Sequence, residues 1–242
     1  MPSLSLDNRL IWFAHCPKAG GTSVEQALVE RWGARVGHLH WGWDLWWRQG
    51  GWRVADPPNS PQHLVWEDAI KALPKLPDVV FALVRSPHER LASEYRYQRR
   101  GRRATLTGRV LAYLPFSFWL RLMLEVSRRN PHAFDNHLRP QADFVPEGAI
   151  VFRLEDGLSP LADWFSKLSD TPPLAFGKAL ATGGRRPIVP ALRARIEAAH
   201  RTDYTRFGYP TEHPVPPQPD ILDRLAHVFA PMVVALDRRG RL

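Results

Sequence analysis

Residues 10–32 read Leu-Ile-Trp-Phe-Ala-His-Cys-Pro-Lys-Ala-Gly-Gly-Thr-Ser-Val-Glu-Gln-Ala-Leu-Val-Glu-Arg-Trp, and this stretch decides the fold. The apolar run 10–14 has the composition of a short strand buried in a parallel sheet. From Val24 onward apolar residues recur at helical spacing, and Thr22 followed three residues later by Glu25 predicts a capping box at the helix start. The sequence therefore predicts a strand, a loop and a helix in succession.

The loop between this strand and helix contains Lys18, Gly20, Gly21, Thr22 and Ser23. The glycines let backbone N–H groups approach an anion closely, and the start of the helix adds positive potential. Lys18 supplies a positive charge, and the two hydroxyl groups supply hydrogen-bond donors. A glycine-rich turn also forms where the chain only has to turn, but the lysine and the hydroxyls favour a loop that binds phosphate or sulfate.

Two other phosphate-binding loops fit these residues less well. In a Walker A loop the lysine follows the glycines, whereas Lys18 precedes both of them. A cysteine-dependent phosphatase loop would begin correctly with His15 and Cys16, but it needs an arginine six residues after the cysteine. Thr22 stands there instead. Neither loop type is therefore expected.

Two further apolar runs predict two more strands. The run Val79–Val84 is followed by Arg85, and Ser86 with Pro87 then provides the N-cap and first position of a helix. The third run, Ala149–Phe152, ends at a charged segment. Three strand–helix units of this kind predict an α/β fold with a mostly parallel sheet covered on both faces, and ligands then bind at the carboxyl ends of the strands.

The first and second strand ends resemble the motifs of sulfotransferases that use 3′-phosphoadenosine 5′-phosphosulfate (PAPS). The resemblance is to the carbohydrate branch, which includes the heparan-sulfate 2-O type. Its first motif is matched by His15, Pro17, Lys18, Gly20, Gly21, Thr22 and Ser23. Its second motif, Val-Arg-x-Pro-x-x-Arg-x-x-Ser-x-Tyr, is matched by Val84–Tyr95. The resemblance implies a three-layer α/β sandwich like that of the P-loop NTPases, with PAPS as the donor and no metal.

The resemblance also implies roles for individual residues. Lys18 would stabilise the oxygen that leaves when the sulfuryl group is transferred, while the backbone of residues 20–23 holds the 5′-phosphate. Arg85 and Ser93 would hold the 3′-phosphate, and Arg185 is a weaker candidate in a loop that closes over the nucleotide. The reaction would be an in-line displacement, in which the protein positions the reactants and stabilises charge.

The acceptor hydroxyl needs a general base, and a neutral histidine suits this role near pH 7. Among the ten histidines, His63 leads because it stands where the resemblance implies the catalytic histidine. His40 and His38 are the next candidates, followed by His137.

Half of the ten tryptophans fall within one short segment: Trp41, Trp43, Trp46, Trp47 and Trp52. Indole faces can stack on sugar rings, and packing of the same indoles on the core is an equally good interpretation. Together with the branch resembled, this segment favours a carbohydrate acceptor.

The length of 242 residues predicts a single domain spanning residues 1–242. Within it we expect a donor-binding core at 10–100, a basic insertion and helix at 101–135, a second half at 136–210, and a proline-rich linker with a terminal helix at 211–242.

The chain has a net charge of +9, and 28 of its 33 basic residues are arginines, since five are lysines. This charge suits an anionic nucleotide donor, an anionic polymer acceptor or nucleic acid. Of these partners we expect the nucleotide donor and the acceptor, and no nucleic acid. Cys16 is the only cysteine, so no intrachain disulfide is expected. No apolar run reaches eighteen residues, and residues 1–9 are too short and polar for a signal peptide, so we expect a cytoplasmic protein without a transmembrane segment. The oligomeric state is not predicted.

Two alternatives to a sulfotransferase stay open from the sequence. One is a nucleotide kinase or another phosphate-binding α/β protein, which the order of Lys18 and the glycines weakens. The other is a nucleotide-binding module without turnover, which the joint presence of Lys18, Arg85 and Ser93 weakens.

Overall fold

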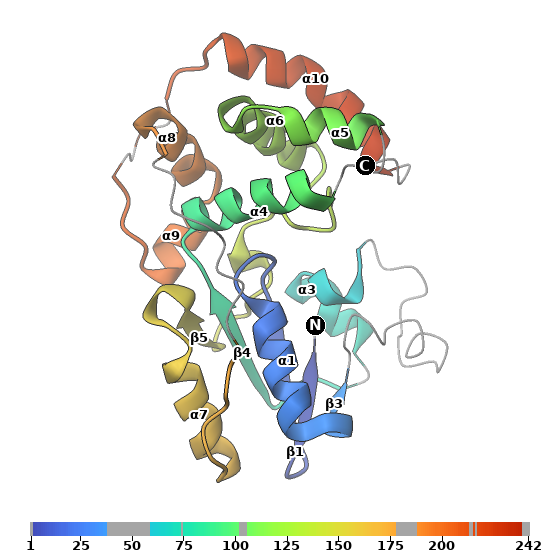
Figure 1. The fold of residues 1–242 in the computed structure, drawn as a ribbon, viewed down its shortest axis with the longest axis vertical. Helices are drawn as coiled ribbons and strands as arrows, with labels where there is room; N and C mark the ends of the chain where they lie inside the picture. Colours follow the sequence, from blue (N-terminus) through green and yellow to red (C-terminus); the bar gives the residue numbers. More distant parts are fainter. Residues whose placement is uncertain are drawn as a thin grey trace. The chain divides into compact units, whose positions relative to one another are not determined.

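The computed structural model describes residues 2–37, 59–73, 75–101, 106–177, 188–212, 215 and 217–238. The chain forms two compact units (Figure 1). The first contains residues 1–85 and 141–181, and the second contains residues 86–140 and 182–242. The chain thus enters the second unit directly after Arg85 and returns to the first at Gln141. The predicted single domain stays a prediction.

The first unit is built on an open five-stranded sheet with the strand order β3-β1-β2-β4-β5. The central strands β2 (Arg9–His15) and β4 (Val79–Val84) are parallel, and β4 pairs in parallel with β5 (Ile150–Arg153). These are the three strands that the apolar runs predict, displaced by at most a residue at either end.

The other two strands have no counterpart in the sequence prediction. Strand β1 (Ser3–Leu6) pairs antiparallel with both β2 and β3 (Val36–Gly37). Asp7 and Asn8 connect β1 to β2 with φ angles of 48° and 62°, which is the conformation of a tight hairpin turn that follows the twist of its strands. The sheet is therefore mixed, with a parallel half and an antiparallel edge.

Side chains on one face of the sheet pack against α1 (Gly21–Trp32) and α7 (Ser159–Ser169). Phe13 of β2 stacks on Phe81 of β4 with ring centroids 4.8 Å apart, and Phe165 of α7 meets Phe81 edge-on. On the opposite face, Trp12 and Ala82 are also fully buried. Burial on both faces explains why these strands read as continuous apolar runs rather than alternating ones.

The shorter elements of the first unit are the 3₁₀ turns Gly33–Arg35, Pro61–His63, Gln141–Asp143 and Leu154–Asp156, and the helix α3 (Trp66–Ala72). The turn at Pro61–His63 leads into α3. Both elements precede β4, the second of the predicted strands.

The second unit is helical. Its elements are α4 (Pro87–Gly101), α5 (Leu106–Tyr113), α6 (Phe116–Arg129), α8 (Pro190–Ala199), α9 (Arg201–Phe207) and α10 (Ile221–Arg238). Figure 1 shows α10 lying along α6. The core between these helices contains the fully buried Trp119, whose indole N–H donates to the side-chain oxygen of Gln98 at 3.0 Å.

The helix predicted to start at Ser86 and Pro87 is confirmed by α4, and the helices expected within residues 101–135 and 211–242 are confirmed by α6 and α10. The basic insertion expected at the start of residues 101–135 is helical where the structure describes it. Helix α4 continues to Gly101, and α5 already begins at Leu106. The buried Leu111 and Ala112 anchor α5 in the unit, and this apolar contact outweighs the basic character of the segment.

Within the described part of the chain, none of the helices combines the length and the apolar character needed to cross a lipid bilayer.

Candidate functional site

The candidate site lies at one edge of the first unit's sheet. Strands β2, β4 and β5 are parallel, with His15 beside Leu83 and Val84 beside Arg153, so their carboxyl ends share this edge. A Cβ atom on Gly20 would come within 3.3 Å of the Leu83 side chain and 3.4 Å of the Leu154 side chain. The loop after β2 therefore lies against the ends of both neighbouring strands, where ligands of α/β sheets bind.

The loop after β2 has a constrained backbone. Lys18 has a φ of 65° and Gly20 a φ of 95°, both in the left-handed region. The Ala19 N–H donates to the Cys16 carbonyl at 3.3 Å, which closes the turn. A left-handed lysine is uncommon because its Cβ crowds the backbone, and such strain persists mainly at sites of function.

Helix α1 begins at Gly21, and its N-cap is Gly20 in the left-handed conformation without a side-chain cap. The predicted capping box between Thr22 and Glu25 is therefore wrong. Thr22 is exposed, and the Glu25 carboxylate turns instead into the unit. The start of the helix therefore has no capping side chain, and the Ser23 N–H donates to the Gly20 carbonyl at 3.1 Å. Helix starts without a side-chain cap can bind anions through their remaining N–H groups.

Gly21 lies against the imidazole of His15. A Cβ atom on Gly21 would lie 2.0 Å from His15 Nε2, a distance that no side chain tolerates. The imidazole also stacks on Phe13, with ring centroids 5.4 Å apart. Packing against His15 therefore requires a glycine at position 21. The His15 side chain also determines how close the loop can come to the end of β2.

His15 is held by the carboxylate of Glu25. Its Nδ1 lies 2.8 Å from Glu25 Oε1, and both side chains are buried. Gln62 also donates from Nε2 to Oε1 at 3.2 Å. Burial alone would raise the pKa of Glu25, but the hydrogen bond and positive charge of His15, with a smaller contribution from Gln62, lower it to about 2. Glu25 is therefore ionised throughout the physiological range.

His63, the predicted general base, lies beside this pair. Its ring meets the His15 ring edge-on with centroids 5.3 Å apart, and Ser60 Oγ lies 3.5 Å from its Nδ1. The side chain is almost fully buried, with 9% of its surface exposed. His63 thus forms a buried cluster with His15 and Glu25, and His15 joins this cluster to the loop.

Arg85 follows the end of β4, and its backbone is clamped by the buried side chain of Gln141. The Arg85 N–H donates to Gln141 Oε1 at 2.9 Å, and Gln141 Nε2 donates to the Arg85 carbonyl at 2.8 Å. The Cys16 thiol contacts the Gln141 carbonyl at 3.9 Å. Gln141 therefore fixes Arg85 and meets the first residue of the Lys18 loop, a role that sequence reasoning did not give it.

The other predicted residues belong to the second unit or lie outside the described residues. Ser93 is buried on α4 in the second unit. His137 is buried in the same unit, and its Nδ1 lies 2.7 Å from Glu94 Oε2. Arg185, His38, His40 and the tryptophans at 41–52 lie outside the described residues.

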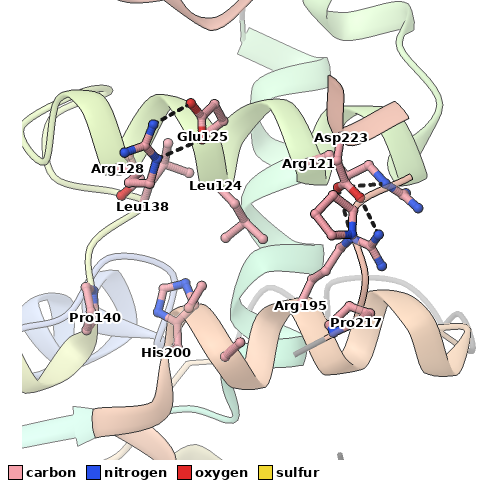
Figure 2. Close-up of a pocket in the computed structure, with 14 residues that line it drawn as sticks. Arg121, Leu124, Glu125, Arg128, Leu138, Pro140, Arg195, His200, Pro217 and Asp223 are labelled. Carbon is pink, nitrogen blue, oxygen red and sulfur yellow. Dashed lines mark hydrogen bonds and ion pairs between the residues drawn. The ribbon is translucent and has the colours of Figure 1, made fainter. Parts of the chain in front are cut away.

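The second unit contains a pocket of about 460 Å³ between α6 and α8 (Figure 2). Leu124, Leu138, Pro140 and Pro217 supply apolar walls, and the buried His200 lies at its base. Burial, together with the nearby charges of Arg90 and His88, lowers the pKa of His200 well below its ordinary value. This histidine is therefore a neutral side chain at neutral pH.

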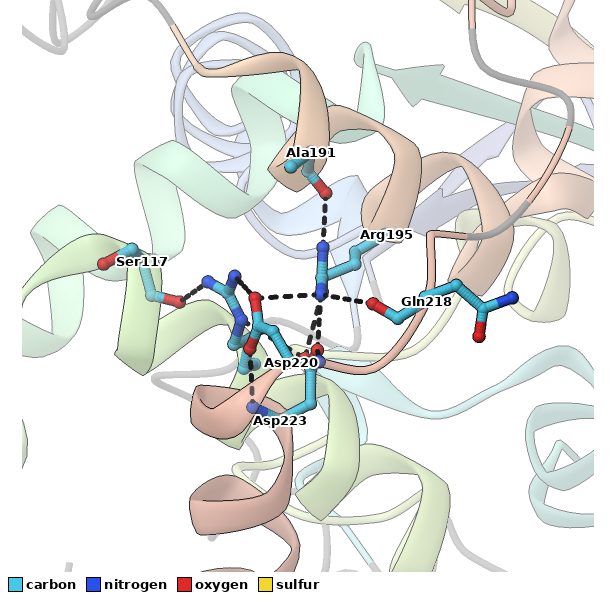
Figure 3. Close-up of polar contacts among 7 residues, drawn as sticks. Ser117, Ala191, Arg195, Gln218, Asp220 and Asp223 are labelled. Carbon is cyan, nitrogen blue, oxygen red and sulfur yellow. Dashed lines mark hydrogen bonds and ion pairs between the residues drawn. The ribbon is translucent and has the colours of Figure 1, made fainter.

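Two arginines at the margin of this pocket are already engaged by carboxylates (Figure 3). Arg121 donates to Asp220 at 2.5 Å and lies 3.2 Å from Asp223. Arg195 donates through Nε to Asp223 at 3.0 Å and also reaches Asp220 at 3.2 Å. Because these guanidinium groups are neutralised, the pocket is a poorer place for a phosphate or sulfate than the loop after β2.

Comparison of the chain with protein-family models, with curated proteins and with solved structures finds no match.

We expect Gly21→Ala to destabilise the protein by at least ~2 kcal/mol, because its methyl group would overlap the His15 imidazole and force the loop away from the strand end. Denaturant unfolding measures the change. Gly177→Ala is the matched control, since a Cβ at Gly177 meets open space. Equal stability of the two variants would contradict the packing argument.

The lowered pKa of Glu25 predicts a contribution to stability that depends on pH. The contribution is complete above the unfolded-state pKa of about 4.5 and is lost as the pH falls through the folded-state value of about 2. Its size is on the order of 3 kcal/mol. Glu25→Gln should therefore be less stable than the natural protein at pH 7, and the difference should shrink toward pH 2.

Unfolding free energies measured from pH 7 to pH 2 test this dependence. Glu30→Gln is the control, because Glu30 is exposed on the same helix. A stability difference for Glu25→Gln that stayed constant over this range would show that the carboxylate charge is not what His15 and Gln62 stabilise.

Proposed function

We propose that this chain is a sulfotransferase that moves the sulfuryl group of PAPS to an acceptor hydroxyl. The observation that carries the proposal is the pairing of two cationic strand ends. Lys18 lies in a strained glycine-rich loop after β2, and Arg85 follows the adjacent parallel strand β4. A donor with phosphate groups at both the 5′ and 3′ positions needs two such cations at separate places.

The rigidity around these two residues supports the same proposal. The loop of Lys18 lies on the buried His15, and the backbone of Arg85 is held by Gln141. Catalysis of group transfer depends on charges that are already in position when charge develops in the transition state. In the proposed mechanism, Lys18 neutralises the oxygen that leaves with the nucleotide, and the backbone of residues 20–23 holds the 5′-phosphate. The N–H groups of residues 20–22 would do this, because the Ser23 N–H donates to the Gly20 carbonyl.

Arg85 and Ser93 are proposed to bind the 3′-phosphate, which distinguishes PAPS from nucleotides without that group. His63 is proposed as the general base that takes the proton of the acceptor hydroxyl. A carbohydrate acceptor and a three-layer arrangement like that of the P-loop NTPases belong to the same proposal and rest on the motif resemblance.

A nucleotide kinase is the weaker alternative. Glu25 is the acidic residue nearest to Lys18 in the sequence, and its carboxylate is occupied by His15 and Gln62. It is therefore poorly suited to hold the Mg²⁺ ion that phosphoryl transfer uses.

The donor assignment predicts that adenosine 3′,5′-bisphosphate binds much more tightly than AMP. Loss of a charge-assisted contact to the 3′-phosphate costs about 1.5–3 kcal/mol, so Arg85→Ala should weaken binding of the bisphosphate by ~10- to 100-fold. AMP binding should change little. Isothermal titration calorimetry measures both affinities.

Arg153→Ala is a matched control for this experiment. Arg153 is also the arginine at the end of a parallel strand, but its guanidinium is paired with Asp156 at 3.0 Å. Equal affinities of the natural protein for the bisphosphate and AMP would remove the proposed donor. Equal losses in the two variants would remove the specific role of Arg85.

The proposed roles of Lys18 and His63 predict two kinetic signatures. Lys18→Ala should lower kcat far more than it raises KM for PAPS, because the charge that it neutralises exists mainly in the transition state. His63→Ala should lower kcat by ~10²- to 10⁴-fold and remove the rise of kcat with pH that a histidine base produces.

Sulfuryl transfer from labelled PAPS to a panel of glycans measures both effects. Lys71→Ala is the control for lost positive charge, because Lys71 is exposed on α3. A Lys18→Ala enzyme with normal kcat but weak donor binding would reduce Lys18 to an anchor. A His63→Ala enzyme that keeps the natural pH profile would move the base to another residue.

A further inference from the structure

The outward face of α10 carries a stripe of large apolar side chains. Its members and their exposed fractions are Ile221 at 66%, Leu225 at 40%, Val228 at 68%, Phe229 at 44% and Met232 at 54%. Their spacing along the helix places them on one side over three turns. The opposite side, represented by Ala226, Ala230 and Val233, is buried in the core that α6 also lines. Single exposed apolar side chains are ordinary, but a continuous stripe marks a surface that another body covers.

The charges around this stripe are predominantly basic. At 100° per residue, the exposed Arg224 and His227 fall on one flank of the stripe. Three more arginines follow in the sequence, at positions 238, 239 and 241. An amphipathic helix with an apolar face and a basic flank is the arrangement of helices that lie in the boundary between lipid headgroups and acyl chains.

The acidic residues of α10 lie on its packed side. Asp223 binds Arg121 and Arg195, and Figure 3 shows its contact with Arg195. Asp237 accepts a hydrogen bond from the Phe134 N–H at 2.9 Å. The two aspartates of α10 are thus directed into the second unit, and Asp220, directly before the helix, pairs with Arg121 and Arg195. Among the described side chains of α10, the basic Arg224 and His227 are exposed beside the stripe.

The adjoining surface of α6 has a similar character. Its Glu125 accepts hydrogen bonds from both Arg128 and Arg129, at 2.9 and 2.8 Å, and lies 2.9 Å from His227 Nδ1. Arg128 nevertheless remains largely exposed, with 65% of its side-chain surface accessible. One carboxylate therefore sits among three basic side chains, and the surface beside the stripe stays positively charged.

We propose that this face of α10 binds an anionic lipid surface. The stripe Ile221–Met232 enters the headgroup boundary, and Arg224 and Arg128 lie at the level of the lipid phosphates. Apolar burial and attraction to anionic headgroups then act together, which is how surface helices gain membrane affinity. Such binding needs no spanning helix.

The charge pattern favours lipid over a second copy of the chain. Two copies that met through the stripe would bring the same basic flanks together, and each copy carries a net charge of +9. Like charges at an interface oppose association, whereas an anionic surface complements them.

Co-sedimentation with lipid vesicles tests the proposal. The natural protein should sediment with vesicles made of equal parts phosphatidylcholine and phosphatidylserine, and much less with phosphatidylcholine alone. The double variant Val228→Glu/Phe229→Glu should bind the mixed vesicles at least ~10-fold more weakly. Arg224→Glu should reduce binding by at least about fivefold, an effect that salt should diminish.

The matched control is Val110→Glu/Tyr113→Glu, which places two glutamates at exposed apolar positions of α5 in the same unit. Circular dichroism melting checks that all variants are folded. Absence of sedimentation of the natural protein would overturn the proposal, as would equal binding by the α10 and α5 variants. A dimer that the α10 variant dissociates, measured by light scattering, together with unchanged vesicle binding, would assign the stripe to self-association instead.

Discussion

The buried contact between Glu25 and His15 is the interaction on which the candidate site depends. It joins the first turns of α1 to the last residue of β2 and so links the two ends of the loop between them. A buried carboxylate is stable only when it is paired and hydrogen-bonded, and Glu25 receives both His15 and Gln62. Without this pair, the start of α1 would not be fixed relative to the end of β2.

The contact between Gly21 and His15 turns that pairing into a constraint on the sequence. The backbone can approach the imidazole only because residue 21 has no Cβ, and it can turn into the helix only because Gly20 tolerates a left-handed conformation. The two glycines therefore meet separate requirements, one of packing and one of backbone angle. Lys18, in the same loop, has a strained left-handed conformation. Its charge is therefore carried by a loop whose backbone is fixed at Gly20 and Gly21.

A second constraint links the loop to the neighbouring strand. Gln141 bonds both backbone groups of Arg85 and contacts Cys16 through its own carbonyl. A buried amide side chain that satisfies an otherwise unpaired N–H and carbonyl at a strand end costs less than leaving those groups without partners. The same two hydrogen bonds fix the backbone of Arg85 at the edge of the sheet. The two cations of the proposed donor site are therefore tied to one rigid frame.

The sequence predicted the parallel strands and most helix starts because apolar runs, prolines and caps are local signals. It missed β1 because Ser-Leu-Ser-Leu is short and its pairing depends on the turn at Asp7 and Asn8. It placed Glu25 in a capping box because the spacing from Thr22 fits one. The competing partner, His15, lies ten residues away and becomes visible only in three dimensions. The role of Gln141 was out of reach for the same reason, since its partner Arg85 is 56 residues distant.

The excess of arginine could not identify the site, and the structure explains why. Arg90 is fully buried and donates to the carbonyls of His137 and Arg139, while Arg121 and Arg195 are neutralised by aspartates. Several arginines of the second unit thus bind backbone carbonyls or aspartates within that unit. The planar, permanently charged guanidinium group suits this role, because it can donate several hydrogen bonds at once. Net charge describes the attraction of the whole chain to anions, whereas the position of a cation at a strand end determines which anion can be bound and held for reaction.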